Sequence, residues 1–272
     1  MSQLSSTSEM VLLWAGEENY RTAEAKLYLK RLNLNSDNFF YRQCNKICSY
    51  YGEVIKNRKF GVLNLVNKCL TSDTEIKQLV IAGSGLDPLG IEVTSLYPNV
   101  KVFELDSENM ETKSKMFSGL GDVSKLNISF INANLLNVSE VIKSLTEYKW
   151  NSEENTMLVL EGISYYLSQK SLQDFIKVIN PAQVVFEFLK IKDEINDESE
   201  KIATQVFKFI SECCNIPEIV RYNHSQIEDI FNLQLITIYG MNKLERMRRG
   251  KNKYFLSEES GWIEVCLLGR GK

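Results

Sequence analysis

From Ile76 onward, short apolar runs alternate with amphipathic segments through the rest of the 272-residue chain. Seven of these runs have the length of strands, and six are rich in Val, Ile, Leu and Phe: 78–82, 100–105, 128–131, 157–160, 183–189, 233–238 and 263–268. Helices are predicted between most of them, over 86–97, 108–118, 139–148, 171–179, 194–214 and 225–231. This alternation predicts an α/β fold whose mostly parallel seven-stranded sheet carries helices on both faces.

Residues 1–72 show no such strand alternation. Apolar residues at helical spacing predict helices over 10–32, 38–48 and 61–70. No linker rich in Pro, Gly or Ser separates this region from the rest of the chain. We therefore predict two parts, a helical cap or lid over 1–72 packed on an α/β domain over 73–272.

Charge and hydropathy argue against several classes of partner. The formal net charge is −3 and no half of the chain is strongly basic, which argues against nucleic acid as a main partner. The one short basic run, 243–253, is typical of a solvated helix face. The chain has no stretch of 18 apolar residues and no signal-peptide pattern at its polar start, so we expect a cytoplasmic protein with no membrane partner.

Cysteine and histidine usage restricts the chemistry. The six cysteines form no CxxC pair and His224 is the one histidine, so we expect no metal site and free thiols in a reducing compartment. His224 lies just before the predicted helix 225–231, where a capping or surface role is typical. A role as a general base stays open for it.

The segment that carries most chemical information is the turn after the first strand. An apolar strand runs directly into Gly83, Ser84 and Gly85, and a helix follows. Glycine allows a tight turn and a close approach of backbone to a ligand, and the N–H groups at a helix start favour polar or anionic groups. The turn alone is weak evidence, since any tight strand-to-helix connection uses similar residues.

The next strand strengthens the case for a nucleoside ligand. It ends at Asp106, about 20 residues after the turn, where a carboxylate is placed to accept hydrogen bonds from both ribose hydroxyls. The fingerprint of nicotinamide enzymes would need glycine at position 88, where Pro88 stands. The sequence therefore favours a nucleoside over a dinucleotide that undergoes hydride transfer.

Two further strands end in polar residues. Asn134 follows the strand 128–131, and Glu161 follows the strand 157–160. Ligands of open α/β sheets bind at the carboxyl ends of the strands. We expect Gly83, Asp106, Asn134 and Glu161 to converge there.

These stretches resemble the leucine carboxyl methyltransferase superfamily, which includes bacterial O-methyltransferases of natural-product pathways. The resemblance rests on the segments 82–87, 103–106, 132–135 and 160–167, together with Asn57-Arg58, and covers about residues 57–190. It implies a Rossmann-like class I methyltransferase fold and S-adenosylmethionine (SAM) as the methyl donor.

The resemblance also implies roles for individual residues. The turn from Gly83 to Gly85 would form the SAM loop, and Asp106 would hold the ribose. Asn134 and Leu135 would face adenine, although the family usually has Asp at the first of these positions. Glu161 would hold the methionine amino group, and Arg58 would pair with the methionine carboxylate through its bidentate guanidinium.

Methyl transfer to an oxygen of a small carboxylate or hydroxyl metabolite is the leading hypothesis. A carboxylate is already deprotonated and needs no base, whereas a hydroxyl would use His224, Glu187 or Tyr165. The aromatic faces of Tyr165 and Tyr166 are candidates for contact with the methyl sulfonium, and core packing is the alternative role.

Other functions of the same SAM site stay open. The aminocarboxypropyl arm could be transferred or cyclised with release of methylthioadenosine, and the C-terminal third matches no motif that decides against this. A protein C-terminal carboxylate could be the acceptor, or the domain could bind SAM without catalysis. A helical lid over 1–72 favours a small-molecule acceptor. The oligomeric state is left open.

Overall fold

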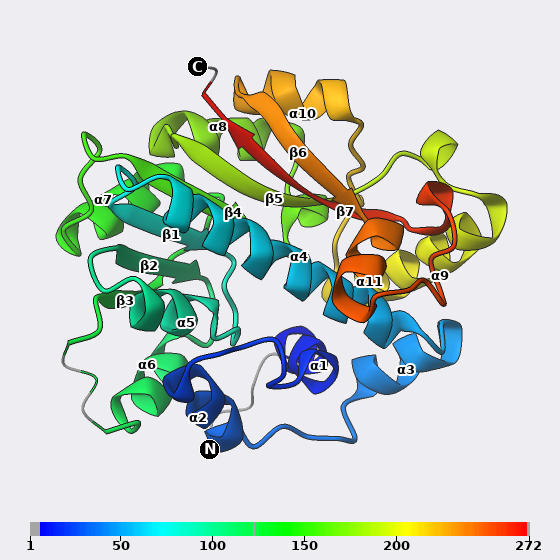
Figure 1. The fold of residues 1–272 in the computed structure, drawn as a ribbon, viewed down its shortest axis with the longest axis horizontal. Coiled ribbons are helices and arrows are strands. Elements are labelled where there is room, and N and C mark those ends of the chain that lie inside the picture. Colours follow the sequence, from blue (N-terminus) through cyan, green and yellow to red (C-terminus); the bar gives the residue numbers. More distant parts are fainter. Residues whose placement is uncertain (1–5, 122, 124, 271–272) are drawn as a thin grey trace.

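The computed structural model describes residues 6–121, 123 and 125–270. Its central element is one twisted seven-stranded sheet (Figure 1). The strand order is β3-β2-β1-β4-β5-β7-β6. Their bounds are β1 Gln78–Ala82, β2 Lys101–Asp106, β3 Ile128–Asn132, β4 Thr156–Leu160, β5 Gln183–Leu189, β6 Gln234–Gly240 and β7 Ile263–Gly269. All seven predicted strands are confirmed to within two residues at each end.

Strand direction divides the sheet into two parts. β1 to β5 are parallel to one another, while β7 runs antiparallel to both of its neighbours, β5 and β6. β1, β4 and β7 are buried along their whole length, which is why their sequences are almost continuously apolar. This topology is that of a Rossmann-like α/β fold and confirms the predicted fold class.

Helices cover both faces of the sheet. On one face lie α7 (Val138–Glu147), α8 (Gln169–Ile179) and α10 (His224–Phe231). The other face is covered by α4 (Tyr51–Ser72), α5 (Leu89–Leu96) and α11 (Met241–Arg249). The remaining helices are α1 Ser6–Ala15, α2 Ala23–Arg31, α3 Phe39–Ile47, α6 Met110–Ser118 and α9 Asp197–Cys214, with short 3₁₀ turns at Ser164–Tyr166, Lys192–Glu194 and Glu258–Ser260.

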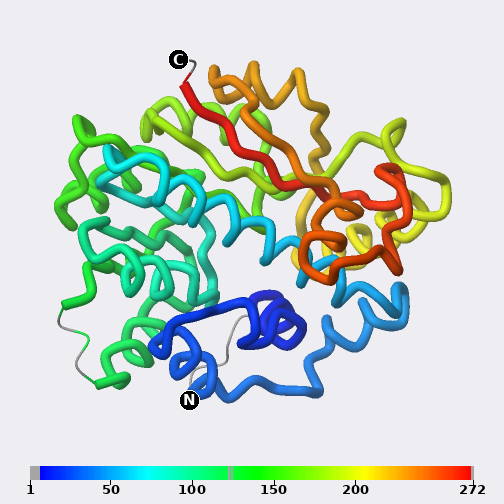
Figure 2. The backbone as a smooth tube through the Cα atoms, in the orientation of Figure 1, coloured from blue at the N-terminus to red at the C-terminus, as the bar shows by residue number. Residues whose placement is uncertain are grey.

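The N-terminal helices differ from the prediction. The single helix predicted over 10–32 is wrong, because the chain leaves α1 at Gly16 with a left-handed φ of +65° and begins α2 after a Thr22 cap. The helix predicted over 61–70 is α4, which begins ten residues earlier at Tyr51. Figure 2 shows α1 to α3, in blue, gathered at one side of the molecule, with α4 running from there across the sheet.

α4 therefore belongs to the layer that covers the sheet. It packs against α11 and β7 as well as against α1. The basic run 243–253 overlaps α11, whose Arg248 donates to Asn57 of α4 at 2.8 Å. Within the part of the chain that the structure describes, no helix is long and apolar enough to cross a membrane.

Candidate functional site

The carboxyl ends of β1, β2 and β4 meet at one edge of the sheet. The N–H groups of Gly83 and Ser84 both donate to the Leu105 carbonyl, at 2.8 and 3.1 Å. Asp106 accepts the N–H of Gly85 at 2.9 Å through Oδ2 and that of Glu108 at 2.9 Å through Oδ1. The glycine turn and the strand-end carboxylate that the sequence singled out are therefore in direct contact.

A buried ion pair fixes the base of this turn. Lys113 of α6 contacts Glu104 of β2, and both side chains are completely buried. Glu104 also accepts the N–H of Gly90 at 3.1 Å, at the start of α5. A charged pair in such a place holds its partners in one geometry, because separating it would leave an uncompensated charge out of water. The pair thus joins β2, α5 and α6 around the turn.

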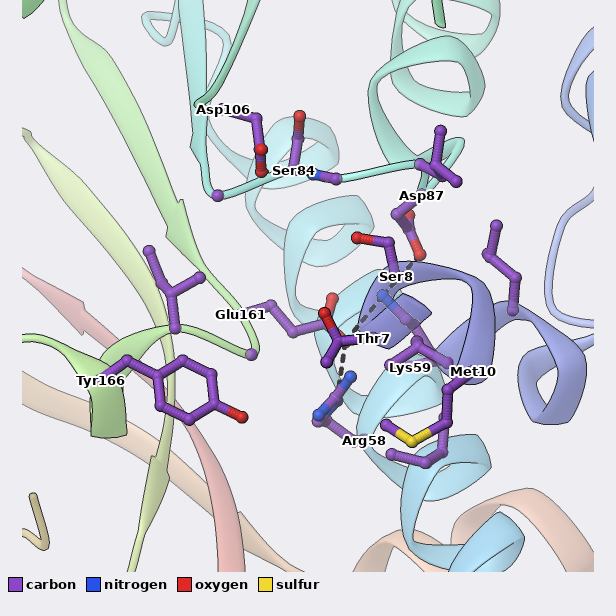
Figure 3. Close-up of a pocket in the computed structure, with 18 of the residues that line it drawn as sticks. Thr7, Ser8, Met10, Arg58, Lys59, Ser84, Asp87, Asp106, Glu161 and Tyr166 are labelled. Atoms are coloured by element: carbon purple, nitrogen blue, oxygen red, sulfur yellow. Dashed lines mark hydrogen bonds and ion pairs between the residues drawn. The ribbon is translucent and has the colours of Figure 1, made fainter. Parts of the chain in front are cut away.

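A cavity of about 240 Å³ opens beside these strand ends (Figure 3). Six segments line it: α1, α4, the glycine turn, the end of β2 with the two residues after it, the residues after β4, and α9. The lining side chains and backbone belong to Thr7, Ser8, Met10, Val11, Leu12, Tyr51, Ile55, Arg58, Lys59, Gly83, Ser84, Gly85, Leu86, Asp87, Asp106, Ser107, Glu108, Glu161, Gly162, Ile163, Tyr165, Tyr166 and Ile210.

Two cations and two carboxylates form a buried network at the centre of this cavity. Glu161 Oε1 lies 3.0 Å from Arg58 Nε and 2.9 Å from Lys59 Nζ. Lys59 Nζ also lies 2.5 Å from Asp87 Oδ2, which accepts the Tyr20 hydroxyl at 2.9 Å. Figure 3 shows Arg58 and Lys59 directed from α4 toward Glu161 and Asp87. The network ties α4 to the turns that follow β1 and β4.

Burial and charge act in opposite directions on these groups. Burial would raise the pKa of Asp87, but Lys59 outweighs it and holds that pKa below its usual value. Burial would lower the pKa values of Arg58 and Lys59, yet the neighbouring acidic groups raise both above their usual values. Asp87 therefore stays ionised, and the two cations stay protonated, around neutral pH.

Two tyrosines complete the wall of the cavity. The Tyr165 hydroxyl accepts a hydrogen bond from Arg58 Nη1 at 3.3 Å, and the Tyr165 ring packs edge-on against Tyr166 with centroids 4.6 Å apart. Burial raises the pKa of each phenol well above its usual value. Both residues are neutral at physiological pH, so they can pack and donate hydrogen bonds but are poor proton acceptors.

Four residues that the sequence offered for the site lie outside the cavity lining, and one of them, Glu187, is fully buried in β5. Asn134 is exposed, and its side chain accepts the N–H of Leu136 at 3.0 Å. Leu135 is half-buried against the core on the α7 and α8 face. His224 begins α10, where its Nε2 lies 2.8 Å from Glu264 Oε2. The adenine contact and the role of His224 as a base therefore stay predictions.

The sequence analysis gave no role to several residues that line the cavity. Lys59 directly follows the predicted Arg58, and Asp87 belongs to the glycine-turn motif, so the neighbouring sequence could have indicated both residues. Nothing in the neighbouring sequence indicates Thr7 and Ser8 of α1, since their approach to the turn depends on long-range packing.

Backbone conformation and close packing both require glycine at two positions of the turn. Gly83 and Gly85 have left-handed φ values of +68° and +49°. A Cβ at Gly83 would collide with Ile163, and one at Gly85 would lie 2.6 Å from Ser8 Oγ. Only glycine gives both the conformation and the space, because Ile163 and Ser8 pack directly against the turn.

One protein family matches the part of the chain that carries the glycine turn and the neighbouring strand ends. The model of the leucine carboxyl methyltransferase family matches residues 37–180, just over half of the chain, which includes the glycine turn, Asp106 and Glu161. The sequence matches no curated protein.

Solved structures share the fold at low sequence identity. A DUF574 family protein from Streptomyces avermitilis superposes with a TM-score of 0.68 at 11% identity, covering 94% of this chain and 99% of its own. A candidate methyltransferase from Thermobifida fusca YX gives 0.67 at 14% identity, with coverages of 93% and 96%. Magnesium protoporphyrin IX methyltransferase from Synechocystis PCC 6803, solved with bound SAM, gives 0.51 at 8% identity and covers both chains completely.

The tight packing of the turn predicts an unequal cost for two glycine substitutions. Gly83→Ala should destabilise the fold by about 2–5 kcal/mol, because it adds a collision with Ile163 to the cost of a left-handed residue. Gly250→Ala is the matched control: φ is +75° there but open space surrounds the Cβ position, so about 1–2 kcal/mol is expected. Urea unfolding measures both, and equal losses would contradict the packing argument.

Proposed function

The chain belongs to the leucine carboxyl methyltransferase family, and on that premise we propose that it methylates a carboxylate oxygen of a small molecule. As a member of this family it is a SAM-dependent methyltransferase with a Rossmann-like fold. The acceptor and the oxygen specificity are the parts that we propose.

The residues around the cavity fit SAM. The turn from Gly83 to Gly85 lines the cavity, and Asp106 presents a carboxylate at the end of β2. We propose that Asp106 binds the ribose, that Glu161 binds the methionine ammonium and that Arg58 binds the methionine carboxylate. Each pairing joins opposite charges or a carboxylate with hydroxyl donors.

The observation that carries the acceptor proposal is the protonation state of the cavity wall. When bound, SAM supplies a methyl group already activated by its sulfonium. Tyr165 and Tyr166 are neutral phenols with raised pKa values, Asp87 and Glu161 are held in ion pairs with Lys59, and neither His224 nor Glu187 belongs to the lining. None of these six groups is thus a well-placed base for a hydroxyl, whereas a carboxylate needs none.

The lining of the cavity supports a small acceptor. Residues of α1 line it together with the aromatic side chains of Tyr51, Tyr165 and Tyr166. The residues of α4 and of the β4 turn would orient the acceptor, and the apolar side chains of α1 would exclude water from the reacting oxygen. A protein C-terminus would need a wider opening.

Mass spectrometry of the nucleosides formed from SAM tests this function. With a panel of small carboxylic acids, we expect S-adenosylhomocysteine and a methyl ester, and no product from the matching primary amides. S-adenosylhomocysteine formed only with alcohols or phenols would reject the carboxylate acceptor. Methylthioadenosine would instead favour aminocarboxypropyl transfer or cyclisation, and labelling of peptides alone would favour a protein substrate.

Asp106→Ala should weaken SAM binding by about 100-fold or more, because it removes the proposed ribose acceptor and the partner of the Gly85 N–H. Isothermal calorimetry measures the affinity. The control is Asp229→Ala, an exposed carboxylate of α10 that should leave binding unchanged. An unchanged affinity in Asp106→Ala, with the fold intact by circular dichroism, would remove the ribose assignment.

We also propose that part of the predicted N-terminal cap acts as a lid. Thr7, Ser8 and Met10 of α1 line the cavity, and Ser8 lies against Gly85. The helix ends at Ala15, just before the left-handed Gly16, and Glu9 fastens it to the α2–α3 connection by accepting the Asn35 N–H at 2.6 Å. Displacement of α1 would open a path to the glycine turn.

Hydrogen exchange with and without S-adenosylhomocysteine tests the lid. Amides of α1 should exchange more slowly in the complex, because the bound nucleoside would hold the helix closed over the cavity. Amides of α10, on the opposite face of the sheet, serve as the internal control. Equal exchange of α1 in both states would contradict a lid role.

A further inference from the structure

A buried carboxyl group lies beneath the turn that follows β4. Glu187 is in the middle of β5 and is fully buried. Its Oε2 accepts the N–H of Gly162 at 2.6 Å, while its Oε1 has no hydrogen-bond partner among the residues that the structure describes. An unpartnered buried polar atom costs free energy, so its retention beside a ligand cavity points to a function.

The groups that face Glu187 come from α4 and from the segment after β4. They are Tyr51, Arg58 and Lys59 of α4, and Glu161, Tyr165 and Tyr166 after β4. Burial raises the pKa of each tyrosine, so all three stay neutral. On the adjacent strand β7, the residue opposite Glu187 is the uncharged Val265. The charges near Glu187 are therefore those of the buried network.

The protonation state of Glu187 sets the net charge of this group of buried side chains. Arg58 and Lys59 balance Asp87 and Glu161, so the four groups together are neutral. Burial raises the pKa of Glu187 to about 7, although Arg58 and the Gly162 N–H act to lower it. Ionised Glu187 gives these five groups together one excess negative charge, and protonated Glu187 gives them none.

We propose that Glu187 is a positioning residue for the cationic end of SAM. Its carboxylate holds the Gly162 N–H and so fixes the turn that carries Glu161, while its negative charge makes the neutral network attractive to a sulfonium. This inference rests on the proposed SAM site and deepens it, because it assigns the preference for a charged donor to a residue that does not line the cavity.

The sign of the pH effect follows from the charge. Raising the pH from 6 to 8 ionises Glu187, so SAM should bind more tightly relative to S-adenosylhomocysteine, which lacks the sulfonium charge. The α-amino groups of the ligands also titrate, and a comparison of the native protein with a Glu187 variant removes that contribution, because it is the same for both proteins.

Calorimetry at pH 6 and pH 8 tests the proposal on the full-length protein. In the native protein, the preference for SAM over S-adenosylhomocysteine should rise about fivefold between the two values. Glu187→Gln should keep a Gly162 acceptor but lose this rise, and Glu187→Asp should restore most of it. Glu264→Gln, a largely buried carboxylate of β7 that pairs with His224, should behave as the native protein does.

Each outcome decides between the alternatives. A pH-independent preference in the native protein, or an equal rise in Glu187→Gln, would overturn the role of Glu187 while leaving the SAM site intact. If Glu187→Gln does not fold, the native profile and Glu187→Asp still decide. Failure of the native protein to bind either ligand at both pH values would overturn the SAM site, and with it this inference.

Discussion

The site depends on the buried ionic network that joins Arg58, Lys59, Glu161 and Asp87. Removing four charges from water is costly, and only close contacts between opposite charges offset that cost. The network therefore tolerates little displacement of the elements that carry it. Since two members come from α4 and two from turns after β1 and β4, the helix and the sheet edge are held in one relative position. This is the preorganisation that a binding site for a zwitterionic ligand requires.

The sequence was a good guide to the sheet for a physical reason. Strands buried on both faces leave runs of apolar residues that few other structures produce, and β1, β4 and β7 are of this kind. The helical region was harder. Asn57, Arg58 and Lys59 lie in the middle of α4 and are buried despite their polarity, so they interrupt the apolar periodicity and hide the first half of the helix. The residues that make the site are the ones that break the pattern.

Within the site, too, some residues could be predicted from the sequence and others could not. Gly83, Asp106 and Glu161 were predicted to meet because parallel strands bring their carboxyl ends to one edge, and they do line one cavity. Asn134 also follows a strand, but β3 is the outermost strand on its side, and the side chain is exposed there. The contribution of α1 could not be predicted from the sequence, because the packing of Ser8 on Gly85 joins residues 77 positions apart.

Charge gives a further reason to favour a carboxylate acceptor. The proposed reaction joins a sulfonium cation and a carboxylate anion and yields two uncharged groups at the reacting centre. Water stabilises the separate charges of the reactants more than it stabilises the partly neutralised transition state. A site that excludes water therefore lowers the barrier to methyl transfer. Tyr51, Tyr165 and the apolar residues of α1 would provide such a surface on their part of the cavity. A neutral hydroxyl would gain less from it, because its methylation would release a proton beside Glu161 and Asp87, which are already paired with Arg58 and Lys59.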